Sequence, residues 1–291
     1  MFIIKYRKLF FIISTVTIAL SVFAMMSKGF ATGIDFKGGT IIEVSYDKVP
    51  DTEVLARSLD DAGFSGARIQ MAGESDVIIK LRSLSEDEHQ ALTRTLALDG
   101  SYQVTEKRFS SIGPTIGKEL RSKAWIAIVM VIVGIVLFIA YAFRHVSEPI
   151  SSWKYGLVTT ITLAHDIIVP AGIFAWMGKE VDTLFVVALL SIMGISVHDT
   201  IVVFDRIREN LKIKLSSDFA TTVGKSLEQT FSRSINTSLT VMIVLAALFF
   251  FGPASTRDFS FILWIGIFIG TYSSVFIASP LLVVIEKRQK K

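Results

Sequence analysis

Apolar residues gather in six long runs along this chain, and one long polar stretch separates the first run from the rest. The runs cover residues 9–26, 124–143, 155–177, 183–204, 235–251 and 259–285. Runs of about 18 or more apolar residues are typical of helices that cross a membrane. The pattern therefore predicts an α-helical membrane protein with six transmembrane helices.

The polar stretch has a different pattern, in which short segments rich in β-branched residues alternate with segments of helical character. The elements expected in chain order are a strand at 40–46, a helix at 51–62, strands at 67–71 and 77–81, a helix at 85–98 and a strand at 102–109. Residues 73–76 have the composition of a turn, and Ser85 with Glu88 forms a capping box at the start of the second helix. The order βαββαβ is that of an α+β ferredoxin-like domain.

These patterns divide the chain into three parts. We expect a first transmembrane helix in residues 1–28, an extracytoplasmic βαββαβ domain in residues 29–122 and a five-helix transmembrane domain in residues 123–291. The first apolar run is longer than the core of a secretory signal peptide, and no small-x-small cleavage site follows Met26. An uncleaved first helix is therefore favoured over a signal peptide.

Lys and Arg residues are concentrated at alternate ends of the apolar runs. One set of ends holds Lys5, Arg7, Lys8, Arg144, Lys154, Arg206, Arg208, Lys212, Lys214, Lys225, Lys287, Arg288, Lys290 and Lys291. The short opposite loops hold Lys179 and Arg257. Because cytoplasmic loops carry the excess of basic residues, this asymmetry predicts that both termini are cytoplasmic.

Composition agrees with a membrane protein and excludes several other classes. The chain of 291 residues is 51% hydrophobic with a mean hydropathy of +0.56, which argues against a soluble protein. The net charge of +4 comes with Lys and Arg residues that cluster at the ends of the apolar runs, where they orient a membrane protein. We therefore expect no nucleic-acid partner. The absence of cysteine excludes disulfides, zinc-thiolate sites and a cysteine nucleophile.

Ionisable residues inside the apolar runs are the main candidates for function. Asp199 lies in the fourth run and Arg233 lies just before the fifth, so the two residues are expected at similar depth. An ionised side chain at the centre of a membrane helix costs about 2.5–3.5 kcal/mol, which favours pairing of the carboxylate with the guanidinium. Protonation of Asp199 would break this pair and drive a rearrangement of helices, which predicts a proton relay.

Other interpretations of these residues remain open. Asp199 could instead reach the cytoplasmic interface and have no role. Asp166 follows His165 in the third run, as Asp199 follows His198 in the fourth, and is a secondary relay candidate or a structural partner of a neighbouring helix. His198 is a further secondary candidate, and Glu228 a weaker one. His165 and His198, each followed by an aspartate, are too few ligands to indicate a metal site, so we expect no metal and no cofactor.

Four motifs resemble the SecD/SecF family of protein-export membrane proteins. They are residues 33–40 (GIDFKGGT), 113–120 (GPTIGKEL), 199–210 (DTIVVFDRIREN) and 230–238 (TFSRSINTS). The resemblance covers nearly the whole chain, and the motifs occur in the order typical of the family. Two departures are that His198 stands where many members have asparagine, and that residues 227–230 read LEQT where the family usually has INQT.

The resemblance implies a fold and a role that composition alone does not. It implies a six-helix half of a transporter of the resistance-nodulation-division type, in a bacterial inner membrane, with a SecD partner, the SecYEG channel and an exported pre-protein. The coupling ion would be the proton, with sodium as the alternative. The motifs add a polar network of Thr200, Asn236 and Thr237. They also add a hinge motif that connects helices and soluble domain: Gly33, Asp35, Gly38 and Gly39.

Two other classes of protein compete with this interpretation. Asp166 and Asp199 could form the carboxylate dyad of an intramembrane aspartyl protease, but the Gly-x-Gly-Asp motif is absent and Arg233 would oppose proton sharing. A small-molecule or lipid transporter of the same superfamily usually has about twice as many helices and two large soluble domains. We therefore expect a non-enzymatic half-transporter that requires a partner.

Overall fold

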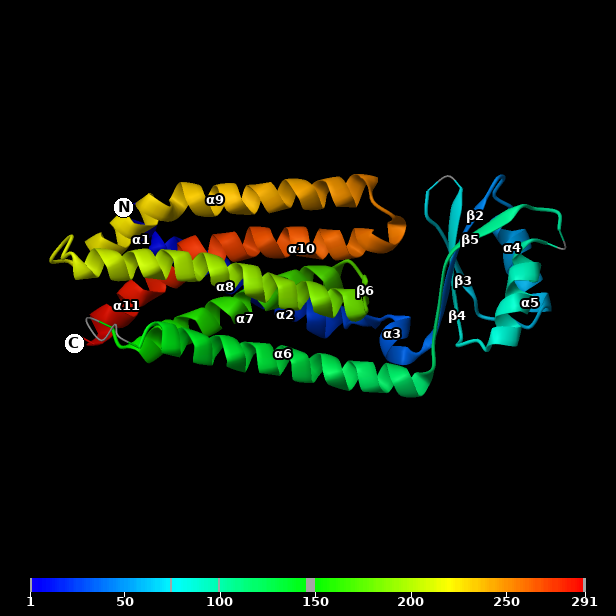
Figure 1. The fold of residues 1–291 in the computed structure, drawn as a ribbon, viewed down its shortest axis with the longest axis horizontal. Helices are drawn as coiled ribbons and strands as arrows, with labels where there is room; N and C mark the ends of the chain where they lie inside the picture. The colour runs from blue at the N-terminus through cyan, green and yellow to red at the C-terminus, as the bar shows by residue number, and fades with distance from the viewer. Residues whose placement is uncertain (1, 74, 99, 145–149, 290–291) are drawn as a thin grey trace. The chain divides into compact units, whose positions relative to one another are not determined.

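A computed structural model describes residues 2–73, 75–98, 100–144 and 150–289 (Figure 1). The chain divides into a helical unit, formed by Met1–Ala31, Ile126–Glu180 and Leu184–Lys291, and an α/β unit, formed by Thr32–Trp125 and Val181–Thr183. Glu74 of the expected turn, together with Lys290 and Lys291 of the C-terminal basic cluster, lies outside the described residues.

Long helices make up most of the helical unit, and α6 begins in the α/β unit. Their bounds are α1 (Phe2–Lys5), α2 (Arg7–Lys28), α6 (Pro114–Ala142), α7 (Ser152–Trp176), α8 (Thr183–Lys212), α9 (Phe219–Phe251), α10 (Ala254–Ser273), the π-helix η1 (Ser274–Ala278) and α11 (Ser279–Gln289). Since α10, η1 and α11 form one continuous span, the described residues contain six helices long and apolar enough to cross a membrane. The predicted number of spans is therefore confirmed.

The fifth span begins much earlier than its apolar run predicts. The run starts at residue 235, but α9 starts at Phe219. The Asp218 carboxylate caps this helix by accepting a hydrogen bond from the Thr221 N–H at 2.8 Å. A polar helical segment therefore precedes the apolar one. The capping side chain satisfies a backbone N–H of the first turn, and this stabilises the start of a helix also where its residues are polar.

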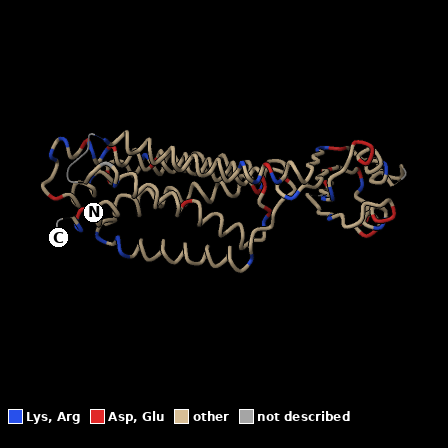
Figure 2. Tube along the Cα trace, turned by 90° about the horizontal axis from the view of Figure 1, so that it is seen from below, with Lys and Arg blue, Asp and Glu red and all other residues tan. Residues whose placement is uncertain are grey.

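Within the helical unit, α9 runs beside α10, and α7 contacts both α2 and α10 (Figure 1). The short elements α1 and α11 lie at one end of this unit, and the α9–α10 connection lies at the other. Charged residues are concentrated towards the ends of the long helices and are sparse along their middle parts (Figure 2). This distribution is the one expected for helices surrounded by lipid.

Gly266 and Gly270 form a Gly-x-x-x-Gly pattern in the last apolar run, a spacing that predicts close contacts between helices. A Cβ atom on Gly266 of α10 would lie 2.1 Å from Ile192 Cδ1 of α8, and one on Gly270 would lie 3.0 Å from Ser196 Cβ. A Cβ on Gly172 of α7 would lie 2.2 Å from the Cβ of Ser21 on α2. The small residues at these positions therefore serve helix packing.

The α/β unit contains the predicted alternation of strands and helices. Its elements include α3 (Ile34–Lys37), β2 (Gly39–Tyr46), α4 (Thr52–Asp61), β3 (Arg68–Met71), β4 (Asp76–Leu81), α5 (Glu86–Leu96) and β5 (Val104–Ile112). The strand order is β3-β4-β2-β5, and every neighbouring pair is antiparallel. Two-residue strands, β1 (Ala31–Thr32) and β6 (Glu180–Val181), lie where the chain passes between units.

One face of this sheet carries the core of the α/β unit. The core residues are Ile42, Val44, Tyr46, Leu55, Leu59, Phe64, Val77, Ile79, Leu81, Leu92 and Leu96. In β4 every second residue is buried, as expected for a strand with one face on the core. The capping box of α5 is confirmed, because Ser85 Oγ accepts from the Glu88 N–H and the Glu88 carboxylate accepts from the Ser85 N–H.

Candidate functional site

Asp199 is buried inside the helical unit, with 4% of its surface exposed. It shares a face of α8 with Ser196, Thr200 and Val203, which are also buried. Its carboxylate accepts a hydrogen bond from Ser238 Oγ of α9 at 3.3 Å, and Ser238 Oγ in turn accepts from Thr271 Oγ1 of α10 at 2.6 Å. Asp199 therefore faces neighbouring helices and not the surroundings of the helical unit.

Three candidate residues of α9, one from the predicted relay and two from the predicted polar network, lie on the outer surface of the helical unit. Arg233, Asn236 and Thr237 are exposed on α9, whereas Ser234 and Ser238 of the same helix are buried. Each residue of a helix is turned by about 100° from the one before it, so positions 233 and 237 point away from the face that 234 and 238 share. Among the described residues no ion pair joins Arg233 to Asp199, whose partner here is Ser238.

His198 and Thr200 flank Asp199 and point in different directions. The His198 side chain is 63% exposed, and its Nδ1 lies 3.9 Å from Asp199 Oδ1. Thr200 is buried and donates from Oγ1 to Ser274 Oγ at 3.3 Å. Among the residues that the structure describes, Thr200, Asn236 and Thr237 therefore do not form the expected network, because Thr200 contacts the last span and the other two residues face outwards.

Asp166 lies at the centre of a second polar cluster, which links three spans. It is fully buried on α7, and its Oδ1 lies 2.9 Å from Nδ1 of His165. Its Oδ2 accepts from Ser196 Oγ of α8 at 2.5 Å and from Ser273 Oγ of α10 at 2.7 Å. Within the part of the chain that the structure describes, no hydrogen bond joins Asp166 to Asp199, so the two acids do not form a carboxylate dyad.

The charged end of α8 is joined to α9 through Gln229. Its Oε1 accepts from Arg206 Nε at 2.6 Å and from Asn210 Nδ2 at 2.8 Å. Asn210 Nδ2 also donates to Ser226 Oγ at 2.8 Å. These contacts hold the two helices together beside the connection between them.

The two glycine motifs contact each other inside the α/β unit. Gly38 and Gly39 have φ angles of +82° and +146°. Residues with a side chain rarely adopt this backbone conformation. A Cβ on Gly38 would lie 2.9 Å from Pro114 N, and one on Gly117 would lie 3.0 Å from Gly38 N. The backbone of one motif therefore lies directly against the other.

Gly33 and Asp35 contact the segment that precedes α8. The Gly33 N–H donates to Val181 O at 2.9 Å, and Asp35 Oδ2 accepts from the Thr183 N–H at 2.8 Å. A carboxylate at a helix N-terminus satisfies a backbone donor that has no partner within the helix. Asp35 of the predicted hinge motif therefore caps the N-terminus of α8, the helix that carries Asp199.

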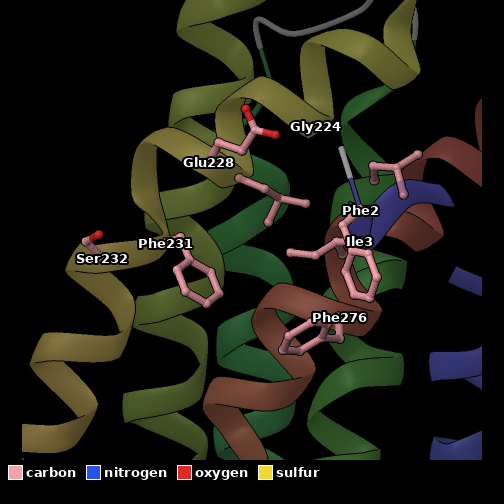
Figure 3. A pocket seen from close by; sticks show the side chains of 9 residues that line it. Phe2, Ile3, Gly224, Glu228, Phe231, Ser232 and Phe276 are labelled. Atoms are coloured by element: carbon pink, nitrogen blue, oxygen red, sulfur yellow. The ribbon is translucent and has the colours of Figure 1, made fainter. Parts of the chain in front are cut away.

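A pocket with apolar walls opens between α1, α9 and η1 (Figure 3). Its volume is about 460 Å³, and its lining residues are Phe2, Ile3, Ile4, Gly224, Leu227, Glu228, Phe231, Ser232 and Phe276. Figure 3 shows the side chains of Phe2, Ile3, Phe231 and Phe276 around the cavity, with Glu228 at its rim and Ser232 turned away. With one carboxyl group at the rim, the pocket has no set of convergent polar groups that would indicate catalysis.

The structure adds hydroxyl and amide residues that the sequence analysis did not select. They are Ser196, Ser238, Thr271, Ser273, Ser274 and Gln229. A signal was present in the spacing, because pairs such as Ser196 with Thr200 and Ser234 with Ser238 recur four residues apart in apolar helices. Hydroxyl groups that share one face of a membrane helix are candidates for contacts between helices.

Comparison with known proteins decides the family. The model of the protein export membrane protein SecD/SecF C-terminal family matches residues 93–288, and the SecD/SecF GG motif matches residues 23–48. The chain belongs to the SecD/SecF family. The match to the GG motif covers Gly38 and Gly39. The match to the C-terminal family covers Asp166 and Asp199 together with their hydrogen-bond partners.

SecD/SecF relatives and structures match nearly the whole chain. A protein translocase subunit SecF of Thermobaculum terrenum is 39% identical over 98% of this chain and 94% of its own length. The protein translocase subunit SecDF of Thermus thermophilus is 35% identical over 94% of this chain, which corresponds to 37% of that longer relative. A crystal structure of SecDF from Thermus matches with a TM-score of 0.83 at 33% identity, over 98% of this chain and 38% of that one.

Proposed function

We propose that this chain is an accessory subunit of the Sec protein translocase that uses the proton motive force to promote pre-protein export. Its relatives are named as protein translocase subunits, which supports a role in transport and not in enzymatic catalysis. The observation that carries the mechanism is the burial of Asp199 among hydroxyl groups in the middle of an apolar helix. An acid in that position is expensive to ionise, so its protonation state and the arrangement of its neighbours are coupled.

The proposed relay begins and ends at Asp199. A proton arriving from the outer side is held by the carboxylate beside Ser238, and its release to the cytoplasmic side leaves an ionised group that requires a new partner. Arg233 is the nearest intramembrane cation along α9 and supplies that partner after a rearrangement of the helices. His198, beside the carboxylate, is the secondary candidate, and sodium is the alternative coupling ion.

The exposed polar face of α9 supports a second subunit. Arg233 lies where the polar part of α9 meets its apolar run, and a guanidinium that faces lipid there is costly, so Arg233 with Asn236 and Thr237 requires cover by protein or water. The relative named SecDF is a single chain of which this protein matches 37%, and its name joins SecD with SecF. We infer that a SecD-like partner covers this face, and that the pair acts with the SecYEG channel on an exported pre-protein.

The α/β unit is proposed to be a ferredoxin-like domain on the extracytoplasmic side. The sheet order β3-β4-β2-β5, with helices after the first and third strands, supports the fold. The asymmetry of basic residues and the position of α1 and α11 at one end of the helical unit support cytoplasmic termini in a bacterial inner membrane (Figure 1). Gly33, Asp35, Gly38 and Gly39 would then transmit motion to the start of α8.

Export of a pre-protein into inverted membrane vesicles tests the proposal. Asp199→Asn keeps the size and a hydrogen-bond acceptor but removes the acid, and we expect it to abolish the part of export that depends on the ion gradient. Asp205→Asn, an exposed position six residues along the same helix, is the matched control and should retain that part. Export that is stimulated by the gradient equally in wild type and Asp199→Asn contradicts the proposed relay. Replacing the proton gradient with a sodium gradient distinguishes the two coupling ions.

A further inference from the structure

Asp166, the secondary relay candidate of the sequence, is a fully buried acid that the proposed relay through Asp199 does not use. Asp166 has 0% and His165 has 3% of their surfaces exposed. The carboxylate receives two hydroxyl donors in addition to its contact with the imidazole, and these come from two other spans. A purely structural bond between helices would not need an ionisable group with an ionisable neighbour, since serine or asparagine makes the same contacts at a lower desolvation cost.

The Asp166–His165 pair can exist in two states that differ by one proton. With a neutral imidazole the pair carries one negative charge, and with one further proton it is neutral. No Lys or Arg forms an ion pair with Asp166 in the described segments, so the negative state is compensated by the Ser196 and Ser273 hydroxyl groups and by His165. Uptake of a proton removes a buried charge and changes which of these groups donates to the carboxyl.

Residues 271–274 of the last span connect this pair with Asp199. Ser273 donates to Asp166 at 2.7 Å, and Thr271 donates at 2.6 Å to Ser238, which donates to Asp199. On α8, Ser196 of the first cluster and Asp199 of the second are three residues apart on one face. A change at one acid therefore reaches the other through two neighbouring spans.

The connecting segment ends where the helix changes its hydrogen-bond pattern. The π-helix η1 begins at Ser274, immediately after Ser273. Ser274 accepts from Thr200, the residue that follows Asp199, and donates to Gly270 O at 2.7 Å. π-Helical turns inside α-helices are frequent at functional sites. A change in the position of this turn would move the hydroxyl groups of residues 273 and 274 relative to the two acids.

We propose that Asp166 and His165 form a second proton-binding site, coupled to Asp199 through residues 271–274. The inference rests on the proposed role of Asp199 in proton transport. Protonation of the pair changes the Ser273 contact, and the shift of the π-helical segment changes the hydroxyl groups around Asp199. Only proton transfer and hydrogen-bond exchange are involved.

The other titratable groups around the pair are few. Tyr272 of α10 has its ring centroid 6.2 Å from that of His165, and its hydroxyl donates to Phe10 O at 3.0 Å. On α8 the nearest acid is Asp199, and α2 has no titratable side chain between Lys8 and Lys28. Arg257 and Asp258 lie at the start of α10, and Glu286 lies on α11. None of these forms an ion pair with Asp166 among the residues described, where the ion pair recorded for this carboxylate is the one with His165.

Infrared difference spectroscopy of the purified complex of this chain with its partner, in lipid vesicles, tests the inference. A pH change should produce a carboxylic C=O band that is lost in Asp166→Asn and kept in Asp199→Asn. Persistence of every titrating band in Asp166→Asn means that Asp166 never takes up a proton, and this overturns the proposal. Export assays of Asp199→Asn test the relay at Asp199 separately. A failure of that relay can therefore be distinguished from a failure of the second proton-binding site at Asp166.

A second variant keeps the inference testable if Asp166→Asn does not assemble. Ser273→Ala keeps the acid and removes one donor, so it should shift the frequency of the Asp166 band. Ser260→Ala is the matched control, because Ser260 is also buried on α10 but donates to the backbone of its own helix, at 2.8 Å to Thr256 O. Identical spectra for wild type and Ser273→Ala overturn the proposal.

The coupling has its own readout in the same spectra. Removing the Asp166 contact by Ser273→Ala should move the pH midpoint of the Asp199 band by about one unit, a tenfold change in proton affinity and within the usual range of coupling between sites. An unchanged Asp199 midpoint, beside a shifted Asp166 band, overturns the coupling to Asp199.

Discussion

Asp35 accepts a hydrogen bond from the backbone N–H of Thr183 at 2.8 Å, although the two residues are 148 positions apart in the sequence. Thr183 is the first residue of α8, and α8 carries Asp199. The acid of the GG motif is thus attached to the start of the helix that holds the proposed proton site. This contact gives the motif a physical role, which is to fix the end of α8.

Removing the Asp35 carboxylate should weaken this attachment. Loss of a side-chain acceptor at a helix N-terminus costs about 0.5–2 kcal/mol, so Asp35→Ala should increase hydrogen exchange at the first turn of α8 and reduce gradient-dependent export. Asp35→Asn keeps an acceptor without the charge and should have a smaller effect. Asp47→Ala, at an exposed position after β2, is the control. Equal exchange in Asp35→Ala and wild type contradicts the capping role.

The contact between the two glycine motifs predicts a difference between two similar substitutions. Gly38 (φ +82°) and Gly66 (φ +77°) have nearly the same backbone conformation, but a Cβ would meet Pro114 only at Gly38 and has open space at Gly66. Both alanine variants lose about 1–2 kcal/mol because of the left-handed conformation. Gly38→Ala should lose more, because the backbone of Pro114 must also move.

Thermal unfolding of the two glycine variants measures this difference. A lower midpoint for Gly38→Ala than for Gly66→Ala is the expected result. Equal midpoints would show that the start of α6 adjusts without cost and would contradict the close contact of the two motifs.

Gln229 is predicted to hold α8 against α9 through its side-chain oxygen. Gln229→Ala removes the acceptor used by Arg206 and Asn210 and should lower the free energy of unfolding by about 1–3 kcal/mol, because Asn210 is buried. Gln229→Glu keeps an oxygen at the same place and strengthens the contact with Arg206, so it should retain most of the stability. Chemical denaturation in detergent compares the two variants, and equal losses would show that the oxygen has no stabilising role.

The Asp76–Lys107 pair predicts a dependence of stability on pH. Lys107 Nζ donates to both carboxylate oxygens of Asp76 at 2.7 Å, and this hydrogen bond is the main cause that lowers the pKa of Asp76. A lowered pKa in the folded state means that the stabilisation is present above the ordinary aspartate pKa of about 3.9 and is lost as the pH falls through the folded value. The α/β unit should therefore lose stability in acid below about pH 4.

Hydrogen exchange of β4 and β5 amides between neutral and acidic pH measures this effect. Asp76→Asn should exchange faster than wild type at neutral pH and show a smaller change in acid. Asp60→Asn, at an exposed position on α4, is the control and should follow wild type. The same acid response in Asp76→Asn and wild type would exclude this pair as its cause.

Features of this protein that depend on local pattern could be predicted from the amino-acid sequence. Length and hydropathy of the apolar runs predicted six spans, because a helix needs a fixed number of apolar residues to cross lipid. The capping box at Ser85 and the β-branched residues of segment 40–46 predicted local elements in the α/β unit, because both depend on neighbours within a few positions. The glycine spacing of α10 likewise predicted close helix contacts.

Which polar groups face each other depends on how the helices pack, and this could not be predicted from the sequence. Periodicity places Asp199 and Ser196 on one face of α8, but it does not tell which helix covers that face. The structure brings Ser238 to Asp199 and Ser273 to Asp166, and it turns Arg233 outwards. These partners come from spans far apart in the sequence, and a rotation of one helix by a single position exchanges an inward residue for an outward one. The pairing of buried charges is therefore set by how the helices pack together, which the order of residues along one helix does not encode.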